Sequence, residues 1–186
     1  MLFRAFVGMS IDGFVAAADK MPAWGKHFNP KSYGYDEFIQ QIDVVVIGRT
    51  TFDQVIRFDA WPWKGRRVFV LTSRPLPAEV PDGVCACLDG LEKLIARLRT
   101  EGLNRDIWIM GGPKMIHSFH VLGSLDRIEI ILLPVLFGTG VPLVAAAMEP
   151  VALRLEHQQT FPDGALRLVY SPAKSPPALS RVDARD

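Results

Sequence analysis

The sequence contains little cysteine, no long hydrophobic run and almost no net charge. Its two cysteines, Cys85 and Cys87, would lie on one face of an extended strand about 6.6 Å apart, near the upper limit for a disulfide. We therefore expect reduced thiols and a cytoplasmic protein. The longest apolar run, Ile130–Phe137, covers eight residues, whereas a membrane-spanning helix needs about 20, so we expect no membrane partner.

The balance of charge excludes another class of partner. The 186 residues include 21 lysines and arginines and 20 aspartates and glutamates, which leaves a formal charge of +1. Proteins that bind nucleic acids usually carry a basic excess, so we expect no nucleic acid partner. A local pocket for a small anion remains compatible with this balance.

Length and composition predict one globular domain followed by a short tail. Hydrophobic residues make up 49% of the chain, which is ordinary for a folded domain. From Ser171 the sequence becomes rich in proline and polar residues, and such a segment buries too little apolar surface to offset its ordering. We expect a domain over 1–170 and a tail over 171–186.

Several short apolar runs predict buried strands. Three of them do not alternate with polar residues, which is typical of a parallel sheet covered on both faces by helices. These three are Val44–Ile47, Val68–Leu71 and Ile107–Met110, and the other two predicted strands are Leu2–Val7 and Ile128–Leu133.

Helical and hairpin patterns complete the predicted fold. Residues 91–98 carry leucine or isoleucine at the spacing i, i+3, i+4, i+7, which predicts a helix that Asp89 caps and Gly102 follows. Apolar and polar residues alternate on either side of Pro162-Asp163-Gly164, which predicts an antiparallel hairpin with one solvated face. The predicted class is three-layer α/β, with a mixed, mostly parallel sheet, flanking helices and an antiparallel C-terminal hairpin.

Three predicted strands end in small or hydroxyl-bearing residues and one cation. Ligands of open α/β sheets bind at the carboxyl ends of the strands, and helix N-termini offer unpaired N–H groups to anions. The pattern therefore predicts a site for a phosphate-bearing nucleotide or dinucleotide, although each segment alone could also be a plain turn. The segments are Gly48-Arg49-Thr50-Thr51, Thr72-Ser73-Arg74 and Gly111-Gly112-Pro113-Lys114.

The second of these segments indicates which cofactor binds. An acidic residue at such a strand end accepts hydrogen bonds from an unphosphorylated ribose, whereas an arginine accommodates a 2′-phosphate. Arg74 is present here, and no acidic residue occurs between the end of this predicted strand at Leu71 and Glu79. We therefore expect NADPH in preference to NADH.

In their order along the chain, these segments resemble the dihydrofolate reductase superfamily, and most closely the reductase domain of the bifunctional riboflavin-biosynthesis deaminase-reductase. The resemblance covers roughly residues 2–170. Besides the three segments above, the matching motifs are Ser10-Ile11-Asp12-Gly13, Leu125-Asp126-Arg127-Ile128 and Pro134-x-x-x-Gly138-Thr139-Gly140.

The resemblance implies a dihydrofolate reductase-like fold with an eight-stranded sheet, and NADPH as the hydride donor to a pteridine- or aminopyrimidine-like ring. It implies that residues 49–51 hold the pyrophosphate, that 72–74 hold the 2′-phosphate end and that 11–13 lie beside the nicotinamide. It also implies a cis peptide bond between Gly111 and Gly112. The implied cofactor-binding residues are Ile11, Asp12, Gly13, Gly48, Arg49, Thr50, Thr51, Leu71, Thr72, Ser73, Arg74, Gly111, Gly112, Lys114 and Met115.

The sequence departs from dihydrofolate reductases at their proton donor. Met21-Pro22-Ala23-Trp24 resembles their Met-Pro-Trp loop, which makes Trp24 our candidate for substrate contact, but Asn29 occupies the position of their essential acid. Reduction of a C=N bond needs a proton as well as a hydride. The catalytic residue therefore stays unknown, and the carboxylates that follow also fit a solvated helix face. The candidates are Asp36, Glu37 and Tyr33.

Two further features have simpler explanations. His117 and His120 could suit a metal, but no third ligand lies near them in sequence, so we expect no metal. The aromatic segment Trp61-Pro62-Trp63 could shield a ligand, and it could equally pack a loop onto the domain.

We expect an NADPH-dependent reductase of a small heteroaromatic substrate, assembled as a homodimer. The alternative is a non-catalytic module that binds NADPH or another nucleotide, which the asparagine at position 29 favours. A third interpretation is an interaction protein that uses the same fold as a dimer scaffold. Binding without consumption of NADPH would indicate the second interpretation, and no binding would indicate the third.

Overall fold

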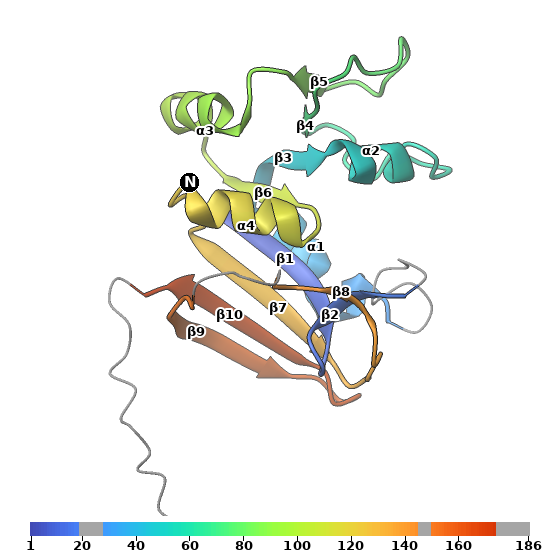
Figure 1. Ribbon diagram of the computed structural model, residues 1–186, viewed down its shortest axis with the longest axis vertical. Coiled ribbons are helices and arrows are strands. Elements are labelled where there is room, and N and C mark those ends of the chain that lie inside the picture. Colours follow the sequence, from blue (N-terminus) through green and yellow to red (C-terminus); the bar gives the residue numbers. More distant parts are fainter. Residues whose placement is uncertain (19–27, 145–149, 174–186) are drawn as a thin grey trace, which may run out of the picture.

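A computed structural model describes residues 1–18, 28–144 and 150–173. Its main element is a mixed eight-stranded sheet in the order β5-β4-β3-β6-β1-β7-β10-β9 (Figure 1). The first six strands in this order are parallel, and β10 is antiparallel to both β7 and β9, which confirms the predicted sheet. The strands are β1 (Phe3–Ser10), β3 (Ile42–Gly48), β4 (Arg67–Leu71), β5 (Val84–Cys87), β6 (Asp106–Met110), β7 (Arg127–Leu133), β9 (Leu153–Thr160) and β10 (Leu166–Pro172).

Helices cover both faces of this sheet, so the domain has the three layers that the sequence predicts (Figure 1). One core contains residues of α1 and α2, and the other contains residues of α3 and α4. The helices are η1 (Pro30–Tyr33, a 3-10 turn), α1 (Tyr35–Gln40), α2 (Arg49–Val55), α3 (Leu91–Thr100) and α4 (Pro113–Val121). The longest of them, α3, has 10 residues, so no helix in the described ranges reaches across a bilayer.

The continuous apolar run in β3 supplies both cores. Val45 and Ile47 point into the core beneath α1 and α2, while Val44 and Val46 point into the core beneath α3 and α4. All four side chains are fully buried. Because successive side chains of a strand face opposite sides of the sheet, an unbroken apolar run is what a doubly covered central strand requires.

A second, two-stranded sheet pairs β2 (Phe14–Ala17) with β8 (Gly140–Pro142). The sequence analysis did not predict these strands, which have four and three residues and are too short to carry a clear pattern. Gly140 is needed for this pairing, since a Cβ atom there would lie 2.1 Å from the Ala16 carbonyl oxygen. Close packing against Ala16 therefore requires glycine at the last position of the Gly138-Thr139-Gly140 motif.

A buried ionic cluster ties β1, β6, β7 and β10 together. Glu129 on β7 is 1% exposed and accepts hydrogen bonds from both Arg4 and Arg167. The Arg4 guanidinium also donates to Asp106 at 2.8 Å and to Gln41 at 2.8 Å. Since each buried charge has an opposite partner, we interpret the cluster as structural.

The ends of the predicted elements are confirmed in part. The helix over residues 91–98 is α3, and Gly102 follows it in the left-handed region with φ +65°. The prediction that Asp89 caps this helix is wrong, because Gly90 is the N-cap with φ +88° and no side chain bonds to the first turn. A left-handed glycine turns the chain into the helix after Asp89, which keeps that carboxylate out of the capping position.

The C-terminal hairpin has the predicted turn at residues 162–164, where the Gly164 N–H donates to the Phe161 carbonyl. Strand β10 continues to Pro172, two residues into the segment predicted as a tail, because residues 171 and 172 still pair with β9. Residues 174–186 lie outside the described ranges. Cys85 and Cys87 are free thiols on β5, as expected.

Candidate functional site

The ends of β4, β3 and β6 meet at one edge of the sheet. Strand β3 lies between the other two, with Gly48 opposite Leu71 and Ile47 opposite Met110. The segments that follow, Gly48–Thr51, Thr72–Arg74 and Gly111–Lys114, therefore leave the sheet side by side. The structure confirms this predicted convergence, which places the chemistry-bearing segments where α/β sheets bind their ligands.

Glycine allows close packing at two of these strand ends. A Cβ atom on Gly111 would lie 3.0 Å from the Met115 Cβ, and one on Gly48 would lie 3.4 Å from the Met115 Cε. Met115 on α4 thus fills the space between the ends of β3 and β6. A Cβ on Gly112, in contrast, would meet nothing within 4 Å, so open space adjoins the start of α4.

The predicted cis bond between Gly111 and Gly112 is wrong. The described residues contain no cis peptide bond, and Gly112 serves as the N-cap of α4 with extended backbone at φ −75° and ψ −176°. The trans form of a non-proline peptide is lower in free energy by about 3 kcal/mol, and here it leads directly into the helix at Pro113.

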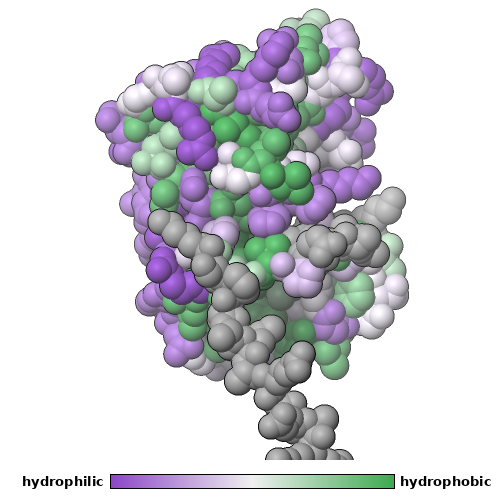
Figure 2. Space-filling model, turned by 60° about the vertical axis from the view of Figure 1, so that its left-hand side comes forward, coloured by the Kyte–Doolittle hydropathy of each residue, from purple (hydrophilic) through white to green (hydrophobic). Residues whose placement is uncertain are grey.

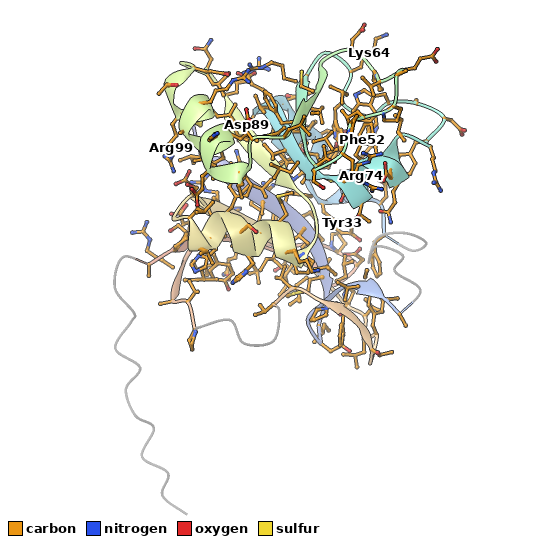
Figure 3. All side chains as sticks on the ribbon, turned by 45° about the horizontal axis from the view of Figure 1, so that its top comes forward. Tyr33, Phe52, Lys64, Arg74, Asp89 and Arg99 are labelled. Carbon is orange, nitrogen blue, oxygen red and sulfur yellow. The ribbon has the colours of Figure 1, made fainter. Side chains whose placement is uncertain are left out.

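The cations of this edge differ in their surroundings. Arg49 donates from Nε to Asp53 at 2.7 Å and from one terminal nitrogen to the Pro75 carbonyl at 2.9 Å, so its guanidinium joins α2 to the loop after β4. Arg74 is exposed and makes no ion pair among the described residues, and it lies beside α2 (Figure 3). Arg74 therefore keeps its charge available for a ligand.

The Thr72 hydroxyl shapes the loop that carries Arg74. It accepts a hydrogen bond from the Arg74 N–H at 3.0 Å and donates to the Arg74 carbonyl at 2.9 Å. Ser73 between them is exposed. The threonine thus fixes the turn, while the hydroxyl of Ser73 and the guanidinium of Arg74 face outward.

An open groove of about 480 Å³ runs from this loop to α3 and α4. On the molecular face that carries α3 and α4, apolar residues are exposed among hydrophilic ones (Figure 2), and Leu88 is 61% exposed. The sequence analysis assigned no binding role to Leu88 and Gly90, which belong to no recognisable motif. The lining comprises Leu71, Thr72, Ser73, Cys87, Leu88, Gly90, Leu91, Lys114, Met115 and Ser118.

The segment after β1 leaves the same edge of the sheet, because β1 runs parallel to β6. Gly13 has φ +88° in a tight turn, and Ile11 is exposed. The Asp12 carboxylate accepts hydrogen bonds from the Ser10 hydroxyl at 2.6 Å and from the N–H groups of Phe137 and Gly138, the latter at 2.7 Å. These bonds, that from Ser10 foremost, lower the pKa of Asp12, so it holds the neighbouring loop as a carboxylate.

A second cavity of about 320 Å³ lies beneath η1 and α2, against the sheet. Its walls are mainly apolar with several aromatic side chains, and Trp63, which is 1% exposed, belongs to the core. The segment 61–63 therefore packs its loop onto the domain and also contributes to a pocket. We call this cavity the aromatic pocket; its described lining is Phe6, Asn29, Pro30, Lys31, Tyr35, Val55, Phe58, Pro62, Trp63, Trp108 and Met110.

None of the three catalytic candidates lines the aromatic pocket. Asp36 and Glu37 are exposed in the first turn of α1. Tyr33 is buried, and its hydroxyl donates to Asp163 at 2.5 Å. Burial and this bond raise the pKa of Tyr33 to about 12. Trp24, the candidate for substrate contact, lies outside the described residues.

Asn29, which the resemblance aligns with the acid of dihydrofolate reductases, has a structural role. Its side-chain oxygen accepts a hydrogen bond from the Lys31 N–H at 3.1 Å and so caps η1. The described lining of the aromatic pocket contains no aspartate or glutamate. Among the described residues, no three His, Cys, Asp or Glu side chains are grouped as metal ligands.

Comparison with known proteins agrees with this architecture. The uncharacterized protein YwjB of Bacillus subtilis (strain 168) is 28% identical over 158 residues, which cover 84% of this chain and 90% of YwjB. A crystal structure from Shewanella sp. PV-4, provisionally named a riboflavin biosynthesis protein, is 28% identical with a TM-score of 0.81, and the match covers 94% of this chain and all of that one.

A bifunctional protein shares the fold at lower identity. The diaminohydroxyphosphoribosylaminopyrimidine deaminase/5-amino-6-(5-phosphoribosylamino)uracil reductase of Thermotoga maritima is 16% identical with a TM-score of 0.69, and the match covers 92% of this chain but 56% of that protein. The sequence profile of the RibD C-terminal domain matches residues 57–166, more than half of the chain. The chain therefore belongs to the RibD C-terminal domain family.

Proposed function

We propose that this protein is an NADPH-dependent reductase that transfers hydride to a small heteroaromatic ring of the pteridine or aminopyrimidine type. The observation that carries the proposal is the convergence of Gly48, Leu71 and Met110 at one edge of the sheet. Open space adjoins this edge, as does a cation, Arg74, that has no ion pair among the described residues. Membership of the RibD C-terminal domain family supports it, since the Thermotoga maritima protein of similar fold is named a uracil reductase.

The residues of this edge fit a dinucleotide with a 2′-phosphate. Arg74 and Ser73 are exposed at the end of β4, where a phosphate monoester would find a guanidinium and a hydroxyl. A Cβ on Gly112 would fill space next to the start of α4, and leaving that space open lets a ligand approach the backbone. Lys114, which lines the open groove between this loop and α4, adds a second positive charge.

When bound, the nicotinamide would supply the hydride, and the chain would supply orientation and a dry site. Ile11 and Gly13 follow β1 at the same edge as the strand ends of the groove. Met110 belongs to the aromatic pocket and directly precedes Gly111. The segment that follows β6 thus leads from Met110 in the aromatic pocket to Lys114 in the groove, and we assign the cofactor to the groove and the reducible ring to the aromatic pocket.

A non-catalytic nucleotide-binding module is the second candidate. It is favoured by the aromatic pocket, whose described lining holds no carboxylate. The two functions differ in one measurable property, since both predict binding of NADPH but only the reductase consumes it.

The test is to titrate the full chain with NADPH and NADH at low salt, and then to follow NADPH by its near-ultraviolet absorbance with a panel of pterins and pyrimidines. We expect NADPH to raise the melting temperature more than NADH does, and at least one ring compound to accelerate NADPH loss. A rise in melting temperature without consumption would assign the binding module. No shift with NADPH would overturn both candidates.

A further inference from the structure

The aromatic pocket has the dimensions and walls of a site for one small flat molecule. Its volume of about 320 Å³ is at the lower end of the range for ligand sites, about 300–1,000 Å³. Tyr35 and Trp108 meet at 5.8 Å with their rings inclined at 65°, and Trp63 meets Trp108 at 5.9 Å and 89°. Edge-to-face pairs of this kind present both ring faces and ring edges to a guest.

The charged residues of the described lining disfavour two kinds of ligand. Lys31 is the only charged residue in its described lining, and that lysine is exposed. A bound phosphate group usually has several cationic or N–H donors, whereas a single solvated cation contributes little. A cationic or amidine-like ring edge needs a carboxylate partner, and the described lining has none.

Arg66, whose charge acts on Tyr35, does not supply the missing cation. Arg66 donates to the backbone carbonyls of Ile39 and Ile42, at 2.8 and 3.2 Å. Its guanidinium is thus used to hold the end of α1 against the start of β3, and it does not line the pocket.

Tyr35 provides the hydroxyl group of the pocket lining. Burial raises the pKa of Tyr35, so the phenol keeps its proton at neutral pH and can donate it in a hydrogen bond. A ring carbonyl or an unprotonated ring nitrogen is the matching acceptor.

From this lining we infer the substrate class: an uncharged, unphosphorylated heteroaromatic ring that carries a carbonyl or ring-nitrogen acceptor, stacked between the aromatic walls and hydrogen-bonded by Tyr35. The inference rests on the proposed reductase function and narrows it. It sets this chain apart from an enzyme whose substrate carries a sugar phosphate, because Lys31, a single exposed cation in the described lining, does not balance a phosphate dianion.

The test is calorimetric titration of the full chain in the presence of NADP⁺, which fills the cofactor groove without turnover. Three probes are compared: lumazine in its neutral form, and the matched pair uridine and uridine 5′-monophosphate. We expect lumazine to bind, and the monophosphate to bind no more tightly than uridine. Tenfold tighter binding of the monophosphate would overturn the inference.

Two variants test the role of Tyr35. Tyr35→Phe keeps the ring and removes the hydroxyl, and it is expected to weaken lumazine binding about 3- to 10-fold, the range of one net hydrogen bond. Tyr170→Phe, a change on β10 outside the pocket, is the control and should leave binding unchanged. Equal affinities of the wild type and Tyr35→Phe would overturn the assignment of the hydroxyl.

The cofactor titration separates the two levels of proposal. If NADP⁺ binds but lumazine does not, the substrate class inferred here is wrong and the proposed function stands. If NADP⁺ itself does not bind, the proposed function fails and this inference fails with it. Melting temperatures of both tyrosine variants confirm that each is folded before it is titrated.

Discussion

The Tyr33 hydroxyl donates a hydrogen bond of 2.5 Å to Asp163, which lies 130 positions further along the chain. The bond joins η1, which forms part of the aromatic pocket, to the turn between β9 and β10. The Tyr33 ring also packs edge-to-face on Phe161 at 5.1 Å. Tyr33, which the sequence suggested as a candidate for proton transfer, thus holds two distant segments together.

The first prediction concerns the ionisation of this phenol. The chain has three tyrosines, and the pKa of Tyr33 is raised to about 12 by burial and by the bond to Asp163. An alkaline absorbance titration of tyrosinate should therefore lose its transition near pH 12 in the Tyr33→Phe variant. The Tyr170→Phe variant is the control and should keep it.

The same bond has a consequence for stability at high pH. A pKa raised in the folded state means that the contribution is present below the unfolded value of 10 and is lost as the pH rises towards about 12. The difference in unfolding free energy between wild type and Tyr33→Phe should shrink across this interval. A transition near pH 10 for Tyr33 would show that its hydroxyl is not bonded to Asp163.

The strands that form the candidate site could be predicted because a strand buried on both faces appears in the sequence as an unbroken apolar run. Val44–Ile47 has no polar residue, and its side chains alternate between the two cores. The glycine, hydroxyl and cationic residues that follow such runs are visible without coordinates. Their convergence then follows from parallel pairing, since carboxyl ends of parallel strands share an edge.

The aromatic pocket could not be predicted, because its walls come from distant parts of the chain. Phe6, Tyr35 and Trp108 each fit an ordinary core position in their own element, and only the fold brings them around one cavity. The predicted helix cap was wrong for a local reason. Asp89 has the right residue type for a cap, but the left-handed backbone of Gly90 moves the start of α3 past it.

The second prediction concerns the loop that Asp12 holds. Replacement by alanine in Asp12→Ala removes the acceptor of the Phe137 and Gly138 N–H groups, so hydrogen exchange at these two amides should become faster at neutral pH. Exchange monitored by NMR or mass spectrometry measures this. Asp82→Ala, at an exposed aspartate before β5, is the control, and unchanged exchange in Asp12→Ala would contradict the role.

The pH dependence of this loop has a definite sign. The pKa of Asp12 is lowered from 3.8 by its hydrogen bonds, that from the Ser10 hydroxyl foremost. The carboxylate's contribution is therefore present above 3.8 and is lost as the pH falls through the lowered value. Both amides should exchange more slowly in the wild-type protein than in Asp12→Ala. This difference should persist at mildly acidic pH and disappear only when the pH falls below the lowered pKa of Asp12.

The third prediction concerns the buried ionic cluster. Glu129→Gln removes the negative charge to which both the Arg4 and the Arg167 guanidinium groups donate hydrogen bonds. Breaking a buried pair leaves uncompensated charge, so the free energy of unfolding in urea should fall by about 3–5 kcal/mol.

An exposed pair provides the matched control for this change. Glu156 on β9 pairs with Arg127 and Arg154, and Glu156→Gln should cost less than about 1 kcal/mol. Equal effects of the two substitutions would mean that the Glu129 cluster contributes no more than a surface ion pair. The comparison therefore separates burial from charge pairing as the cause.

The fourth prediction tests the cofactor assignment at a single side chain. Arg74 is exposed, makes no ion pair among the described residues and follows β4 at the converging edge. If it binds the 2′-phosphate, Arg74→Ala should weaken NADPH binding about tenfold or more, the range of one charged hydrogen bond, and change NADH binding by less than about twofold. Arg105→Ala, at the opposite end of β6, should affect neither cofactor.

Salt gives an independent check of the same contact. The preference of the wild-type protein for NADPH over NADH should decrease as ionic strength rises, because the contact joins two exposed charges. Arg74→Ala should show a weaker dependence on salt, and Arg105→Ala should match the wild type. Equal losses of affinity for NADPH and NADH in Arg74→Ala would mean that the arginine contacts a part that both cofactors share. The end of β4 would then not explain a preference for NADPH over NADH.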